Sequence, residues 1–179
     1  MSLPKLYVED GYVPIPRVRL GDAAYGLALQ SFPVVCTDAV IYDSRRRTIF
    51  LAKRKSKPMT GWWVIGGRTL AGETMRESIN RCFMRETKFD IGSLQFDYVC
   101  TNEYIWKDRQ QVPQAIGCHC LARTFKIELS AVNRELVESN LECNEYDKSM
   151  GLREFTREDL VSEGVYSAIL DVYDLIFSK

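Results

Sequence analysis

The feature that most constrains the fold is a glycine turn between a short apolar run and an amphipathic helix. The run Trp62-Trp63-Val64-Ile65 is rich in β-forming residues, is too short for a helix, and ends at Gly66-Gly67. Two glycines in succession remove the Cβ atoms that would keep a ligand away from the backbone. Thr74 and Glu77 then have the spacing of a capping box, which satisfies the first amides of a helix. The stretch therefore predicts a strand, a turn open to a ligand, and a helix that starts after Thr74.

The predicted helix carries a carboxylate on its apolar face. At helical periodicity that face consists of Met75, Ile79, Cys82, Phe83 and Glu86. An unpaired charge on a buried face is costly. Glu86 therefore either has a cationic partner, such as Arg85, Lys88 or a more distant arginine, or binds a metal cation that faces the glycine turn. We favour the cation.

The spacing of this region resembles the Nudix box, Gly-x5-Glu-x7-Arg-Glu-U-x-Glu-Glu-x-Gly-U, in which U is aliphatic or aromatic. The matching positions, within residues 67–89, are Gly67, Glu73, Arg81 and Glu86. The chain departs from the pattern at Cys82 and Arg85, where the family has glutamates, and at Lys88, where it has glycine. One carboxylate and one guanidinium thus replace three carboxylates, which are too few oxygen ligands for a cluster of Mg²⁺ ions.

Within the Nudix family the chain is most similar to the GDP-mannose mannosyl hydrolases, whose box keeps the arginine and only the last glutamate. The likeness covers about residues 30 to 90. It implies an α/β protein, a Nudix-type α/β/α sandwich around a mixed β-sheet. It also implies a hydrolase that acts on a nucleoside diphosphate linked to another moiety, such as the nucleotide-sugar GDP-mannose. One Mg²⁺ ion, or Mn²⁺ in its place, would be held by Glu86 and the Gly66 carbonyl.

Three further polar residues are candidates for the site. Asp38 interrupts a predicted strand, so it is either a buried aspartate paired with an arginine or a backbone amide, or, by the resemblance, a contact to the sugar. Arg54 precedes the loop that leads into the glycine turn, where a guanidinium can neutralise a diphosphate; the resemblance assigns it to the departing diphosphate. Arg68 would hold the nucleotide or a phosphate.

Two arginines of the box helix complete the candidates for substrate binding. Arg81 either clamps phosphate or forms a salt bridge with Glu73 or Glu77 on the same helix. Arg85 stands where the family has a metal-binding glutamate. We hypothesise that its fixed charge substitutes for a missing cation.

The general base is not identified by the sequence. In the similar hydrolases a loop histidine has this role, but the only histidine here is His119. On a strand His119 points away from Cys118 and Cys120, so these three residues cannot bind one zinc ion and are interpreted as strand filler. The acidic stretch 128–147 is interpreted as a surface connection, and Asn144, Glu145 and Asp147 are its candidate ligands or bases. A catalytically weak or inactive binding module, a sensor of nucleotides or nucleotide-sugars, is therefore the alternative function.

The remaining pattern predicts one domain. Residues 1–31 form a proline-containing lead-in with a short helix at about 23–29, and 32–179 form the Nudix domain. A hairpin (32–41 with 48–53), two further strands (94–106 and 114–128) and a C-terminal helix capped by Thr156 are expected. The resemblance implies that the lead-in contributes to a homodimer interface.

Charge and cysteine usage set the remaining expectations. Lys and Arg number 24, as do Asp and Glu, so no overall field favours a nucleic acid or a membrane surface. Six cysteines occur with no signal peptide and no apolar run long enough for a bilayer, which predicts reduced thiols in the cytoplasm. The first residues, Met1-Ser2-Leu3, are compatible with an origin in an expression vector.

Overall fold

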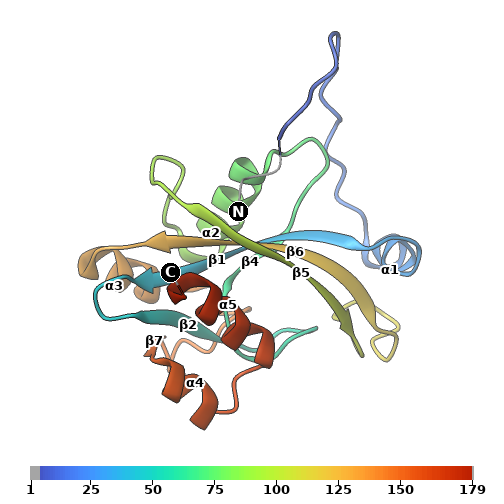
Figure 1. Cartoon of the computed structure of the whole chain (residues 1–179). Helices are drawn as coiled ribbons and strands as arrows, with labels where there is room; N and C mark the ends of the chain where they lie inside the picture. Colours follow the sequence, from blue (N-terminus) through green and yellow to red (C-terminus); the bar gives the residue numbers. More distant parts are fainter. Residues whose placement is uncertain (1–4, 179) are drawn as a thin grey trace.

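A seven-stranded mixed sheet forms the centre of the computed structural model, which describes residues 5–178 (Figure 1). Met1-Ser2-Leu3 lie outside the described residues. The strands are β1 (Val34–Asp43), β2 (Thr48–Arg54), β3 (Gly61–Trp63), β4 (Ile65–Arg68), β5 (Asp97–Trp106), β6 (Cys118–Glu128) and β7 (Leu152–Phe155). The main path runs β3-β2-β1-β6-β5, while β4 pairs with β1 and β7 pairs with β2.

The central strand β1 pairs with three neighbours. On one edge it pairs with β6 in parallel, in a register that includes Asp38↔Thr124. On the other edge it pairs antiparallel with β2 near Ile41 and with β4 around Asp38↔Gly66. The two antiparallel partners share one edge of β1, which changes from β4 to β2 between Ala39 and Ile41, close to Asp38.

Helices cover both faces of this sheet, which confirms the α/β/α sandwich (Figure 1). One face packs on α2 (Met75–Thr87) and α3 (Ala131–Ser139) through Phe83 and Val137, which are fully buried. The other packs on α4 (Arg157–Ser162) and α5 (Ser167–Phe177) through Leu160 and Val172. The predicted short helix is present as α1 (Asp22–Ser31), near the start of β1 and β6.

The box helix α2 has the predicted capping box and the predicted buried face. Glu77 Oε2 accepts a hydrogen bond from Thr74 N at 2.8 Å, and Thr74 Oγ1 accepts one from Glu77 N at 3.3 Å. The helix ends at Thr87, and its C-cap Lys88 has a left-handed φ of 57°. This conformation explains the glycine that the Nudix box has at that position, because glycine adopts it with least strain.

The predicted hairpin and the two following strands are confirmed, but the stretch 128–147 differs from the interpretation as a surface connection. It contains α3, whose N-cap Ser130 accepts a hydrogen bond from Asn133 N at 3.2 Å. Val137, on α3, and Leu141, just past the end of that helix, are buried against the core. The many acidic residues of this stretch had favoured the interpretation as a surface connection.

Three further observations concern the C-terminal helix, membrane spans and the cysteines. The C-terminal helix is divided into α4 and α5 near Gly164, which has a φ of 60°. Within residues 5–178 no helix is both long and apolar enough to cross a membrane. All six cysteines are free thiols.

Candidate functional site

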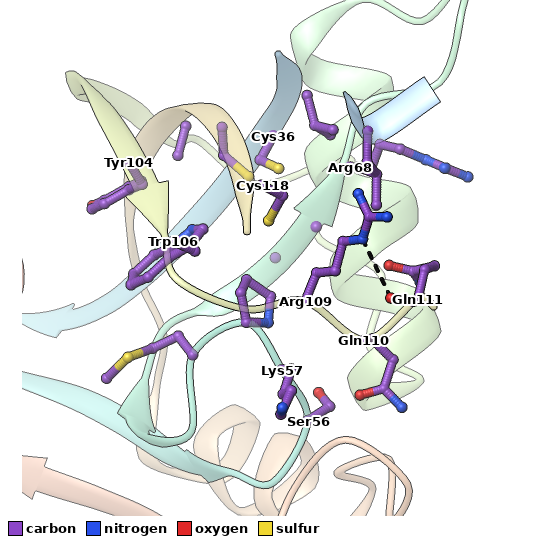
Figure 2. Close-up of a pocket in the computed structure, with 18 of the residues that line it drawn as sticks. Cys36, Ser56, Lys57, Arg68, Tyr104, Trp106, Arg109, Gln110, Gln111 and Cys118 are labelled. Atoms are coloured by element: carbon purple, nitrogen blue, oxygen red, sulfur yellow. Dashed lines mark hydrogen bonds between the residues drawn. The ribbon is translucent and has the colours of Figure 1, made fainter. Parts of the chain in front are cut away.

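A cavity of about 400 Å³ lies where the glycine turn, the start of β1 and two loops meet (Figure 2). Its size suits a small-molecule ligand. The loops are 55–60, after β2, and 107–117, between β5 and β6; α1 contributes from the side. Cationic side chains outnumber carboxylates in its wall: Arg19, Arg54, Lys57, Arg68, Arg85 and Arg109 against Asp22, Asp38 and Glu145. The cavity therefore favours an anionic ligand.

The glycine turn allows β4 to approach β1 closely. A Cβ on Gly66 would lie 2.3 Å from Asp38 Oδ1 and 2.4 Å from the Thr37 carbonyl oxygen, which no real atom tolerates. A Cβ on Gly67 would lie 3.0 Å from the Arg85 guanidinium, which thus lies over the turn. Gly66 is required for strand packing beside the cavity, and Gly67 lies beneath a cationic group.

Asp38 lies in the cavity wall with a carboxyl group that the fold leaves unpaired. It is 7% exposed, and within residues 5–178 it has neither a hydrogen bond nor an ion pair of its side chain. Burial raises its pKa from 3.8 to about 7, against the opposing charge of Arg54 and with a smaller contribution from Glu86. The pairing that the sequence allowed is not formed, and the group can exchange a proton near neutral pH.

Glu86 is buried and held by two protein donors. Arg85 Nη2 donates to its Oε1, and the Tyr146 hydroxyl donates to its Oε2. Burial raises the pKa of Glu86, and the Arg85 charge opposes that rise. The arginine partner that the sequence gave as one alternative is therefore present.

The donor set around Glu86 does not fit a Mg²⁺ ion in this arrangement. Both carboxylate oxygens already accept hydrogen bonds, and hard cations need several free oxygen ligands. Among the described residues no group of three His, Cys, Asp or Glu side chains is placed to hold a metal ion. The proposed roles of Glu86 and the Gly66 carbonyl as metal ligands remain predictions.

The candidate arginines occupy different positions relative to the cavity. Arg54 lines it, with Nε bonded to Ser56 Oγ at 3.0 Å and Nη2 3.4 Å from Glu145 Oε2. Arg68 lines it with its guanidinium 4.1 Å from the centre of the Tyr25 ring.

Arg81 lies outside the cavity wall. Its guanidinium binds Glu73 through two hydrogen bonds, of 2.5 and 2.9 Å, and donates to the Arg68 carbonyl at 2.7 Å. The salt bridge to Glu73 that the sequence offered as the alternative role of Arg81 is formed. The additional bond to the Arg68 carbonyl connects Arg81 to β4.

Sequence reasoning missed an aromatic wall opposite the arginines. Tyr104 and Trp106, labelled in Figure 2, stack with ring centroids 5.1 Å apart and planes 15° apart. Trp63 packs edge-on against both. Tyr104 and Trp106 lie two residues apart on β5, so strand alternation would have placed both on one face. Such a wall suits a base or a sugar ring.

Tyr146, Cys118 and Cys120 were also missed as components of the site region. Tyr146 stands among acidic residues, and no pattern in the sequence predicted its hydrogen bond to Glu86. The two cysteines line the cavity, while His119 points the other way and lies 2.7 Å from Glu103. Their orientation follows the predicted alternation, but they are part of the cavity wall rather than strand filler.

Solved structures with the same fold place this architecture among Nudix proteins. A MutT Nudix hydrolase from Burkholderia pseudomallei is 22% identical with a TM-score of 0.54, and the match covers 72% of this chain and 87% of that one. Dihydroneopterin triphosphate pyrophosphohydrolase from E. coli is 14% identical with a TM-score of 0.53, over 80% and 94% of the two chains.

An Ap4A hydrolase from C. elegans is 12% identical with a TM-score of 0.51, over 81% of this chain and 96% of that one. No model of a protein family matches the sequence, and no curated protein matches it. At these identities the likeness establishes the fold.

Proposed function

We propose that this chain, which has the Nudix fold, is a hydrolase that cleaves a nucleoside diphosphate linked to another group, with a nucleotide-sugar such as GDP-mannose as its substrate. The observation that carries the proposal is the composition of the cavity. Arg54 and Arg85, on β2 and α2, lie beside the glycine turn and suit diphosphate oxygens, and Arg68, on β4, suits the nucleotide or a phosphate. The aromatic wall of Tyr104 and Trp106 suits a base or sugar ring.

The residues of the cavity supply two of the functions that hydrolysis needs. Arg54 lies beside the glycine turn and withdraws charge from the departing diphosphate. Asp38, with a pKa of about 7 and an unpaired carboxyl group, takes a proton from the attacking water at neutral pH. Because the donors around Glu86 do not fit Mg²⁺, no step is assigned to a metal ion.

A second candidate function is a sensor that binds a nucleotide or nucleotide-sugar without cleaving it. The specific observation in its favour is the double hold on Glu86 by Arg85 and Tyr146. These two hydrogen bonds occupy Glu86, the one carboxylate that the box keeps for metal binding. They do not involve Arg54, Arg68 or the aromatic residues of the cavity wall that would bind the ligand.

One experiment separates the two candidates. The protein is incubated with GDP-mannose, GDP-glucose or ADP-ribose, in Mg²⁺, Mn²⁺ or EDTA, with products followed by chromatography and binding by calorimetry. Product formation supports the hydrolase, and binding without product supports the sensor. Neither binding nor product contradicts both.

Two variants show whether the measured activity belongs to this cavity. Arg54→Gln should lower the rate about 100-fold or more, because it removes charge stabilisation of the leaving group. Arg45→Gln removes the same charge from an exposed turn outside the cavity and should leave the rate unchanged.

A further inference from the structure

Arg109, in the loop 107–117, is a buried arginine with an unsatisfied donor. Arg109 is only 1% exposed. Nε donates to the Gln111 carbonyl at 3.3 Å (Figure 2). Nη2 donates to the Val112 carbonyl, also at 3.3 Å. Among residues 5–178, Nη1 has no hydrogen-bond partner. A buried donor without a partner destabilises the folded state, and a charged one does so more strongly.

The Arg109 charge also has no counter-ion within the described part of the chain. The acid beside it, Asp108, is paired instead with Lys57 at 3.2 Å. An arginine cannot escape the cost of burial by losing its proton. A buried, uncompensated guanidinium in a cavity wall therefore calls for an anion from outside the protein.

A second guanidinium lies against the neighbouring residue of α1. A Cβ built on Gly26 would lie 3.6 Å from Arg109 Nη2, and the ring of Tyr25, one residue earlier, lies 4.1 Å from the Arg68 guanidinium. Both arginines line the cavity. At the other end, Arg54 is engaged with Glu145 and Arg85 with Glu86. Among the described residues, the two cavity arginines beside α1 therefore have no carboxylate partner, unlike Arg54 and Arg85.

We propose that Arg109, together with Arg68, binds an anionic group of the ligand at the α1 end of the cavity, apart from the diphosphate that Arg54 receives. The ligand is then a nucleoside diphosphate compound that carries a further phosphate or a carboxylate. The assignment of the diphosphate to Arg54 rests on the proposed function. The need of Arg109 for an anion does not.

The test compares ligands that differ only in that group, by calorimetry at fixed ionic strength. GTP against GDP tests a phosphate, and GDP-mannuronate against GDP-mannose tests a carboxylate. The acidic member of one pair should bind at least tenfold more tightly to the natural protein. Arg109→Gln should abolish that preference while keeping the affinity for the neutral member. Arg109→Lys should keep part of it, and Arg45→Gln should keep all of it.

Thermal unfolding tests the same inference without a nucleotide. Arg109→Gln removes a buried, unpaired charge, so the ligand-free variant should melt at or above the temperature of the natural protein. Inorganic phosphate should raise the melting temperature of the natural protein and not that of the variant.

The outcomes separate this inference from the proposed function. If no nucleotide binds but phosphate protects only the natural protein, the proposed function fails and the anion site stands. Equal affinity within both ligand pairs, or an equal loss for acidic and neutral members in Arg109→Gln, overturns the assignment. So does equal protection by phosphate of both proteins, or of neither.

Discussion

At the scale of single residues, the two carboxylates nearest the glycine turn are held in opposite ways. Glu86 accepts hydrogen bonds from Arg85 and Tyr146, whereas Asp38 has no polar partner of its side chain within residues 5–178. The difference decides what each can do. An occupied carboxylate fixes the position of its donors, while an unpaired one beside a cavity is available to exchange a proton.

The raised pKa of Asp38 predicts a pH-dependent cost. The group is protonated in the fold up to a pH of about 7 but ionises at about 3.8 when unfolded. The folded state therefore binds the extra proton between these values, and stability falls as the pH rises through that window. The shift corresponds to up to about 4 kcal/mol.

Asp38→Asn should lack this fall, so its advantage in urea unfolding should grow from pH 5 to pH 8. Asp171→Asn, an exposed control, should behave as the natural protein does. A constant difference between Asp38→Asn and the natural chain across this range would contradict the prediction.

In the hydrolase assay, the rate of the natural protein should rise with pH through about 7, because Asp38 must be ionised to accept a proton.

Arg85 allows a direct test of the hypothesis that a fixed charge stands in for a cation. Arg85→Glu removes the donor from Glu86 and adds a second carboxylate beside it, so the variant should gain a demand for Mg²⁺ in both activity and thermal stability. Arg85→Gln releases Glu86 without adding a charged ligand and should gain less. Metal dependence equal to that of the natural protein in the glutamate variant would count against the hypothesis.

At the scale of elements, the cavity depends on how closely β4 packs against β1. The sequence indicated why two glycines stand together, but it pointed to a ligand as the neighbour. The structure gives Gly66 a different reason, since it faces the Thr37 carbonyl and the Asp38 carboxylate across a strand pair. Pairing of β4 with β1 depends on contacts distant in sequence, so local patterns could not predict that contact.

Two neighbouring substitutions should separate these roles. Gly66→Ala places a methyl group against rigid backbone and should lower the free energy of unfolding by about 2–3 kcal/mol. Gly67→Ala meets the movable end of Arg85 at 3.0 Å and should cost under about 1 kcal/mol. Denaturant unfolding of both variants measures the difference; equal costs would mean that β4 can move away from β1.

At the scale of the whole molecule, local signals predicted the elements and long-range pairing supplied the site. The capping box at Thr74, the hairpin and the strand alternation around His119 are set by residues close in sequence, and each is confirmed. Burial of Arg109 and the contact of Tyr146 with Glu86 join segments tens of residues apart, so no periodicity reveals them. The homodimer remains a prediction, and the described part of its expected segment, residues 1–31, has exposed apolar side chains, among them Leu6, Tyr7 and Val13.

The triple pairing of β1 has a consequence for how a ligand enters. A strand bonded along both edges, and packed on helices above and below, opens only when most of the molecule comes apart. We therefore expect β1, which carries Asp38, to have a high free energy of local opening. Entry and release of a ligand should then depend on the loops at the cavity edge, 55–60 and 107–117, and not on the strand that carries Asp38.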